Sequence, residues 1–510
     1  MMNALLFLLG LCPILWLIVA LTLLKWPTWK AACGSMIVAF ALAMLVWKLP
    51  LMETLTAGLE GILMALWPIV VVIIAAVFTY NLTVRTGAME TIKQMMTSVT
   101  SDKRLLVLLV AWCFGGFMEG MAGFGTAIAI PASMLVGLGF PALFSCLVCL
   151  LANGVPTPFG SIGIPTVTLA NLVGLENAPL SFTETLQLTP FMILVPFLIV
   201  IVTGKGLKAL KGIWPIVLMS GLSFVLPQMA VAYFVGAELA VVVGSVCSIA
   251  VTVLLSIKVK PAPEYKMELE KGKPLTLKKA LQAWSPFICI FVLLLATSKL
   301  LPPINNYLEQ FSSTVYVYSG ENPNALKFTW VNTAGVWIFL SGIIGGLIQK
   351  ANWNTFRSVF VDTLKQMMPT ILTMCFVLAC AKIMGYAGMI TSISAFAIMV
   401  TGSFYPFFAP WLGALGTFVT GSGTSSGVLF GAVQMNASEA LHLDPYWIVS
   451  LNSLGVAAGK MLSPQSIAIA LGAVDGNGQD SKLLSMILPY GAAFLLLMSV
   501  FAYIGTMFLA

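Results

Sequence analysis

The sequence predicts an all-α polytopic membrane protein of about 12 transmembrane helices. Of the 510 residues, 59% are hydrophobic and only 8% are charged. Because a soluble domain carries about 25% charged residues, the bilayer must be the solvent for most of this surface. The apolar segments are long and continuous. They favour helices over a barrel, since barrel strands are short and alternate in polarity.

Twelve segments are long enough to cross the hydrocarbon core, which takes about 20 apolar residues. The first segment has no Lys or Arg before it, so we expect a retained helix rather than a cleaved signal peptide. Two further apolar regions, 105–138 and 404–435, are interrupted by glycines and are predicted to form re-entrant hairpins. The predicted crossings are 3–24, 31–49, 62–83, 141–170, 186–204, 213–234, 239–257, 285–302, 328–349, 369–386, 446–470 and 484–508.

Basic residues predict the orientation, because Lys and Arg concentrate in short cytoplasmic loops. The intervening loops are poor in them, and we assign acidic residues such as Glu176 and Glu184 to outer loops. Both termini are therefore predicted outside. The net charge of +7 reflects the basic loops and does not indicate nucleic-acid binding. Those loops follow segments 3–24, 62–83 and 186–204, fill 258–283 and precede 369–386.

An internal repeat relates the two halves of the chain. Four landmarks recur in the same order, the first two pairs 301 residues apart and the third pair 298 residues apart. The landmarks are Pro68 with Pro369, Gly87 with Gly388, "GFGT" (123–126) with "GSGT" (421–424), and "NGVPTPFGSI" (153–162) with "NSLGVAAGKMLSPQSI" (452–467).

The charge pattern makes this repeat an inverted one, because it sends segments 62–83 and 369–386 across the membrane in opposite directions. Five crossings per repeat and a two-helix linker account for all twelve. We predict a first repeat over 1–204, a linker with a basic cytoplasmic loop over 205–283, and a second repeat over 284–510. Inverted repeats with helices broken near the midplane are typical of secondary transporters.

The broken helices predict a binding site, since lipid cannot satisfy exposed backbone groups and each break must face protein or a wet cavity. At 123–126 and 421–427 the following hydroxyl residues (Thr126; Thr424, Ser425 and Ser426) are predicted to cap a new half-helix, whose positive end suits a carboxylate. The alternative is close helix packing through small residues. The predicted substrate-binding residues are Gly125, Thr126, Asn153, Gly423, Thr424, Ser425, Asn452, Ser453 and Lys460.

Ionisable residues inside the membrane are costly and indicate function. Lys460 is a natural partner for a monocarboxylate, although it could extend to an interface instead. Glu119, just before the first glycine break, is our candidate for proton coupling, and the alternative is a structural partner of Lys460 or of a helix terminus. Lys382 is expected to extend towards the outer surface. His442, the single histidine, is expected in a structural loop role, and no metal or cofactor site is predicted.

Three stretches resemble the L-lactate permease family: "MEGMAGFGTAIAIP" (118–131), "ANGVPTPFGSIGIP" (152–165) and "NSLGVAAGKMLSPQSIAIA" (452–470). The resemblance extends from about Pro68 to the end of the chain. It implies proton-coupled uptake of L-lactate and related small 2-hydroxy monocarboxylates (glycolate, D-lactate) across a bacterial inner membrane. The partners would be the substrate, protons and lipid.

Two rival functions stay open at this point. A sodium-coupled carboxylate transporter could hold Na⁺ with unwound carbonyls and side-chain oxygens. An anion channel is less favoured, because a two-fold inverted repeat does not build a pore lined by a ring of subunits. A membrane enzyme would need clusters of His, Asp or Cys, which a chain with one histidine does not offer. The preferred substrate and the oligomeric state are left open.

Overall fold

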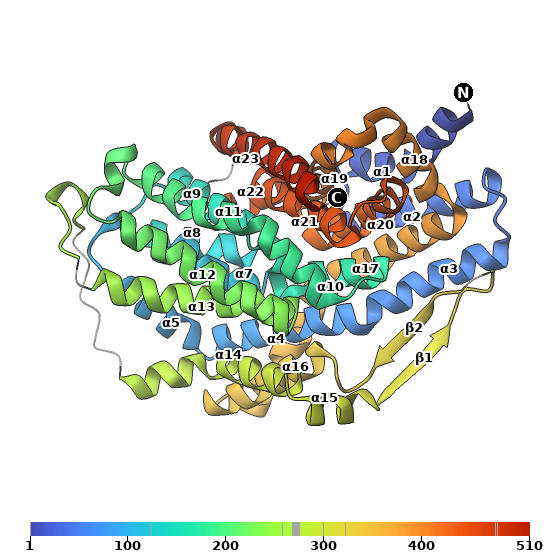
Figure 1. Ribbon diagram of the computed structural model, residues 1–510. Coiled ribbons are helices and arrows are strands. Elements are labelled where there is room, and N and C mark those ends of the chain that lie inside the picture. The colour runs from blue at the N-terminus through green and yellow to red at the C-terminus, as the bar shows by residue number, and fades with distance from the viewer. Residues whose placement is uncertain are drawn as a thin grey trace.

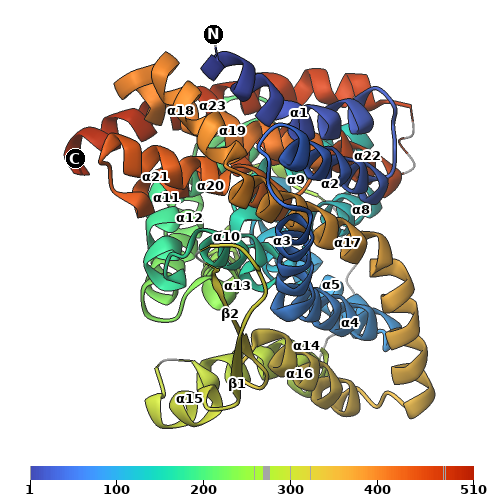
Figure 2. The ribbon, with the colours of Figure 1, turned by 90° about the vertical axis from the view of Figure 1, so that its right-hand side faces the viewer.

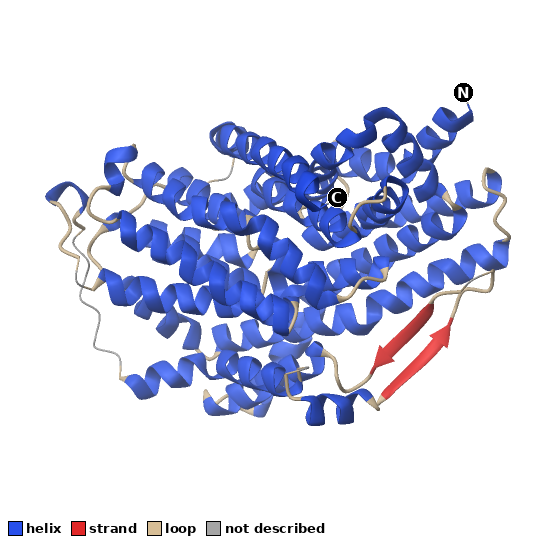
Figure 3. Cartoon of the chain, viewed as in Figure 1, coloured by secondary structure: helices blue, strands red, loops and turns tan. Residues whose placement is uncertain are grey.

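The computed structural model describes residues 2–509 apart from residues 124, 258, 268–275, 299, 322, 475 and 477. Phe124 of the first glycine motif and part of the predicted basic loop therefore lie outside the described residues. Helices dominate the described chain, together with a β-hairpin in which Ser312 of β1 pairs with Thr329 of β2 (Figure 3). The helices run side by side through the molecule, and the hairpin lies beside α3 (Figure 1).

The elements of the first half and of the linker helices have the following bounds: α1 Met2–Thr22, α2 Thr28–Leu45, α3 Leu51–Met64, a π-helical segment Ala65–Val70, α4 Val71–Arg85, α5 Ala88–Thr97, α6 Lys103–Val107, a π-helical segment Leu108–Phe114, α7 Gly115–Met121, α8 Thr126–Gly137, α9 Ala142–Gly154, a 3₁₀ turn Thr157–Phe159, α10 Gly160–Val173, α11 Asn177–Thr203, α12 Trp214–Phe234 and α13 Ala237–Ser256. Those that follow are α14 Leu277–Thr297, α15 Pro302–Glu309, β1 Ser312–Tyr316, β2 Ala325–Thr329, α16 Ala334–Ile348, α17 Trp353–Ala387, α18 Met389–Thr401, α19 Tyr405–Thr420, α20 Gly423–Leu441, α21 Pro445–Leu462, α22 Pro464–Gly472 and α23 Asp480–Leu509.

The predicted crossings all correspond to helices of the structure. Among the described residues, 11 helices are long and apolar enough to cross a membrane, or up to 13 if each of two bent helix pairs is one span. This set includes α6–α7 and α18–α19, which contain the first arms of the predicted hairpins, and omits the shorter α16. The start predicted for segment 328–349 was wrong. Residues up to Thr329 form β2 and α16 begins at Ala334, because a short apolar run does not distinguish a strand from a helix.

The two halves contain the same succession of elements. A helical span of 35 residues (Leu51–Arg85 or Trp353–Ala387) is followed by a left-handed glycine, Gly87 or Gly388. A short helix, a broken hairpin, a bent pair of helices and a long final helix come next in each half. The bent pairs are α9–α10, with a bend of 67°, and α21–α22, with a bend of 46°.

Side-chain contacts show that the repeats are inverted. Glu60, in α3, forms an ion pair of 2.8 Å with Lys382 near the end of α17. Arg85, at the end of α4, forms one of 3.0 Å with Asp362 nearer the start of α17. The corresponding 35-residue spans therefore run antiparallel, with α3 and α17 side by side (Figure 2). The halves also exchange contacts symmetrically, α10 packing on α20 and α22 on α8.

The linker helices pack on the first half, α12 against α11 and α13 against α7 and α10. The order of elements agrees with two repeats separated by two helices. The predicted boundaries at 204/205 and 283/284 stay a prediction, and the second of them falls inside α14.

Candidate functional site

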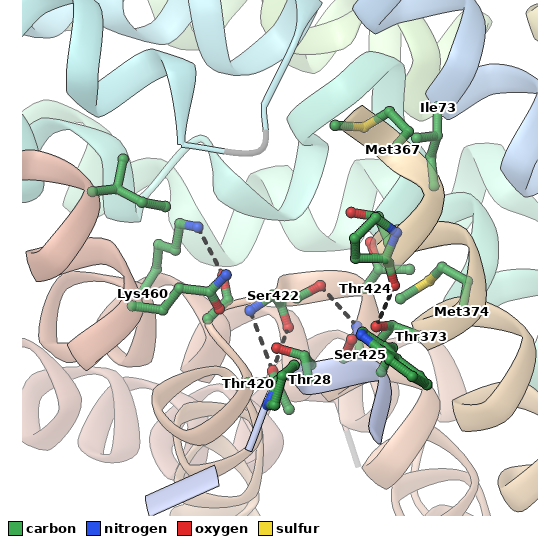
Figure 4. Close-up of a pocket in the computed structure, with 17 residues that line it drawn as sticks. Thr28, Ile73, Met367, Thr373, Met374, Thr420, Ser422, Thr424, Ser425 and Lys460 are labelled. Carbon is green, nitrogen blue, oxygen red and sulfur yellow. Dashed lines mark hydrogen bonds between the residues drawn. The ribbon is translucent and has the colours of Figure 1, made fainter. Parts of the chain in front are cut away.

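A cavity of about 440 Å³ reaches the break of the second hairpin (Figure 4). Its lining includes Pro27, which precedes α2, and Thr28 and Trp29, the first residues of that helix. It also includes the break between α19 and α20 and Lys460 of α21. Middle residues of α17, among them Thr373 and Met374, complete the lining.

A second cavity of about 60 Å³ adjoins the first and receives side chains from both halves. Lys460 and the break of the second hairpin line both cavities. The first half contributes Glu119 of α7 and the turn between α9 and α10. The residues that line this central cavity are Glu119, Thr157, Gly160, Ser161, Ile164, Pro165, Gly421, Ser422, Gly423, Thr424 and Lys460.

The second hairpin is broken at Gly421, whose φ of 68° is left-handed. Ser422 then caps α20, its Oγ accepting the Ser425 backbone N–H at 3.2 Å. The prediction that Thr424, Ser425 and Ser426 provide the cap was wrong, because the helix begins at Gly423 and these residues lie within its first turn. The N-terminus of α20 borders the central cavity, and its backbone N–H groups favour an anion there.

The first hairpin is broken differently. Gly125, with φ of 88°, precedes α8, and Thr126 Oγ1 donates to the Gly123 carbonyl at 2.8 Å. The prediction that Thr126 caps the half-helix was wrong, because α8 has no side-chain capping bond. Gly125 and Thr126 do not line either cavity. Gly125 instead contacts Ile469 of α22, which lines the larger cavity.

The non-helical start of α10 is another contribution of the first half to the centre. Ser161, Ile162 and Gly163 have consecutive left-handed φ values of 48°, 58° and 74°. A left-handed conformation costs roughly 1–2 kcal/mol for a residue other than glycine. The Ser161 hydroxyl donates to the Ala122 carbonyl at 2.8 Å, which ties this turn to the break of the first hairpin.

Lys460 lies in the last turn of α21 and is 6% exposed. Its Nζ donates to the Gly421 carbonyl at 2.8 Å, across the break of the second hairpin. Gly455 and Gly459 let α21 approach α19 closely, since a Cβ on either would collide with backbone atoms of Pro410 or Ala414. The lysine is therefore held by a rigid helix pair rather than extending to an interface.

Glu119 is 3% exposed and lines the central cavity together with Lys460. Asn153 Nδ2 donates to Glu119 Oε2 at 2.7 Å. Gly160 leaves room for the carboxylate, because a Cβ there would lie 2.4 Å from Oε1. The structure thus brings six of the predicted site residues together at the cavities. They are Glu119, Asn153, Gly423, Thr424, Ser425 and Lys460.

Asn452 and Ser453 are buried outside the two cavities. Ser453 Oγ donates to Glu184 Oε1 at 2.5 Å. The assignment of Glu184 to an outer loop was wrong, because α11 begins at Asn177 and the side chain is fully buried. The apolar segment predicted here began at residue 186, so this polar first part of the helix was missed.

Other residues of the site were also missed. Five further residues line the cavities, and in the sequence only the proline and glycine residues around them indicated a broken helix there. They are Thr157, Ser161, Gly421, Ser422 and Gln465.

The expectation that Lys382 extends to the surface was wrong, because its side chain is 12% exposed and pairs with Glu60. His442 lies at the C-cap of α20 with φ of 55°, and the described residues contain no cluster of three His, Cys, Asp or Glu able to hold a metal.

Comparison with known proteins identifies the family of the chain. The model of the L-lactate permease family matches residues 6–509. An L-lactate permease of Streptococcus iniae is 42% identical over 442 residues, covering 87% of this chain and 93% of that protein. The glycolate permease GlcA of Escherichia coli K12 is 33% identical, covering 93% and 91%. The YdaH transporter of Alcanivorax borkumensis aligns with a TM-score of 0.46 and 15% identity over 86% of this chain and 85% of that one. With its many apolar helices, the chain is therefore a multi-pass plasma-membrane protein that belongs to the L-lactate permease family.

Proposed function

We propose that the protein is a proton symporter that takes up L-lactate and related small 2-hydroxy monocarboxylates, such as glycolate and D-lactate, by alternating access. The observation that carries the proposal is the buried Lys460, which lies beside the N-terminus of α20 and shares one small cavity with Glu119. The names of the lactate and glycolate permeases similar to this chain support the substrate class.

The site suits a small 2-hydroxy carboxylate. The substrate carboxylate would lie between the Lys460 ammonium and the backbone N–H groups of Gly423 and Thr424. Hydroxyl groups of Thr157 and Thr424 border the same cavity and would bond the 2-hydroxyl. Ser425 would contribute from the larger cavity.

In this proposal, the remaining predicted site residues stabilise the broken helices and do not contact the substrate. Asn153 orients Glu119, and Ser453 bonds to Glu184. Gly125, Thr126 and Asn452 lie in or beside the broken helices without lining the cavities, so we assign them to the framework rather than to substrate contacts.

Charge balance supports proton coupling through Glu119. Without substrate, the Lys460 ammonium and the Glu119 carboxylate offset each other in the buried centre. A bound monocarboxylate adds one negative charge, and an uncompensated buried charge costs several kcal/mol. A proton taken up by Glu119 restores neutrality, so at least one proton would enter with each carboxylate.

Alternating access is supported by the inverted repeats, which let one scaffold form two related conformations. In the conformation described here, Lys460 and the start of α2 at Thr28 and Trp29 line the same cavity. The basic loop that precedes α2 is predicted to be cytoplasmic, so we assign the conformation as inward-facing.

The test is uptake of labelled L-lactate into sodium-free proteoliposomes, with and without an inward proton gradient. Accumulation that requires the gradient and collapses with a protonophore is expected, and unlabelled glycolate or D-lactate should compete. Glu119→Gln should exchange labelled for unlabelled lactate but not accumulate it. Uptake only after sodium is added would replace the coupling ion, and flux without exchange would indicate a channel.

A further inference from the structure

A second buried carboxyl group joins the two bent helix pairs, away from both cavities. Glu184 lies in α11 and is fully buried. One of its oxygens accepts a hydrogen bond from Ser453 of α21, and the other lies against the hydroxyl of Thr166 in α10. Thr166 follows the left-handed turn that lines the central cavity, and Ser453 precedes Lys460 on the same helix. Glu184 therefore connects two of the helices whose residues line the central cavity.

Counting hydrogen atoms shows which form of Glu184 fits this arrangement. Thr166 Oγ1 is within hydrogen-bonding distance of two oxygens, Glu184 Oε2 and the Pro158 carbonyl oxygen, the latter at 2.9 Å. A threonine hydroxyl has one hydrogen, and a carbonyl oxygen can only accept. If Thr166 donates to Pro158, the second hydrogen must belong to Glu184. The chain then runs from Ser453 to Glu184, from Glu184 to Thr166 and from Thr166 to Pro158.

The surroundings of Glu184 offer no compensating positive charge. Neither α10 nor α12 contains a charged residue. Lys460 of α21 bonds to Gly421 and shares the central cavity with Glu119. Among the described residues, the Glu184 carboxyl interacts with the two hydroxyls alone. The other ionisable side chains on elements packed against α11 are Lys103, Arg104, Cys113, Cys146, Cys149, Lys208, Tyr233, Glu238, Cys247 and Tyr446.

We infer that Glu184 is a second proton-binding site, which carries its proton in this conformation and releases it when α10 and α21 move apart. Ionised Glu184 cannot donate to Thr166, so the Thr166 hydroxyl would have to turn from Pro158 towards the carboxylate. Pro158 belongs to the turn beside Thr157, which lines the central cavity. Proton occupancy of Glu184 is thereby linked to the shape of the site. This role rests on the proposed transport function.

Infrared spectroscopy of the purified protein tests the proton directly. The wild type should show the carbonyl stretching band of a protonated carboxylic acid, and Glu184→Gln should lack it. Ser453→Ala should shift the frequency of the band without removing it, because the carbonyl oxygen loses its donor. Glu238→Gln is a matched control on α13 and should leave the band unchanged. Absence of a band that depends on Glu184 would overturn the inference.

Transport by Glu184→Gln tests whether that proton moves. The amide can donate to Thr166 and accept from Ser453, so the variant should fold and should exchange lactate as the wild type does. It cannot release a proton at this position, so gradient-driven accumulation should fall several-fold while coupling through Glu119 remains. The wild-type band should change when lactate is added. A band insensitive to lactate, with wild-type accumulation by the variant, would make the proton structural and refute the inference. A wild type that accumulates nothing in a proton gradient would instead refute the proposed function, while the lactate-dependent band would still report Glu184.

Discussion

The two broken hairpins have the same outline but different chemistry at the centre of the protein. The second hairpin, α19–α20, presents its break itself to the cavities, with Gly421, Ser422 and Thr424 in the wall. The first hairpin, α7–α8, presents the acid that precedes its break, while Gly125 contacts Ile469. Under the proposed function, a repeated scaffold therefore would supply an anion-binding end from one half and a proton-binding group from the other.

The charged residues show the same asymmetry. The 298-residue offset of the glycine motifs places Thr417 at the position that corresponds to Glu119. The stretch 452–467, which contains Lys460, is longer than its counterpart 153–162, and that counterpart contains no charged residue. In the proposed mechanism, the symmetry of the backbone would serve the alternation of conformations. The asymmetry of the side chains would allow an anion and a proton to bind together.

The largest effect should come from removing the cation of the second half. Lys460→Met leaves the substrate carboxylate without its charged partner, and such a contact contributes about 1.5–3 kcal/mol. We expect the half-saturating lactate concentration to rise roughly 10- to 100-fold. Lys365→Met removes an exposed charge from α17 and should change little. Equal kinetics of both variants in proteoliposome uptake would exclude Lys460 from substrate binding.

A smaller effect should follow when the acid of the first half is displaced rather than removed. Gly160→Ala places a Cβ 2.4 Å from Glu119 Oε1, although the backbone conformation of Gly160 suits alanine. Proton-driven accumulation should fall several-fold while the protein still folds. Gly137→Ala, where nothing lies within 4 Å, is the matched control. Normal accumulation by Gly160→Ala would show that the position of Glu119 is not critical.

The smallest effect should be a difference in protein stability between variants of the two helix breaks, because only the second break has a side-chain cap. Ser422→Ala removes the acceptor of the Ser425 N–H and should destabilise the protein by about 1 kcal/mol. Thr126→Ala should cost less, because the Gly123 carbonyl still accepts the residue 126 backbone N–H at 3.0 Å. Thermal unfolding midpoints in detergent measure the difference. A larger loss for Thr126→Ala would contradict the different construction of the two breaks.

Much of the architecture follows from properties that are local in the sequence. The length of apolar segments predicts the crossings, because the bilayer sets the length of a helix that spans it. Spacing of Pro68, Gly87 and their counterparts predicts the repeat, and the basic loops predict its inversion. Glycine clusters also predict the breaks, since glycine tolerates the left-handed conformations found at Gly125 and Gly421.

Tertiary structure alone decided which of these residues meet. Gly125 and Gly423 occupy equivalent motifs, yet only Gly423 lines the central cavity, because helices from the opposite half determine what each break faces. The burial of Glu184 and the pairing of Lys382 with Glu60 likewise depend on neighbours more than 250 residues away in sequence. Hydropathy and glycine content describe each segment by itself, whereas the rotation and packing of the helices determine which side chains share a cavity.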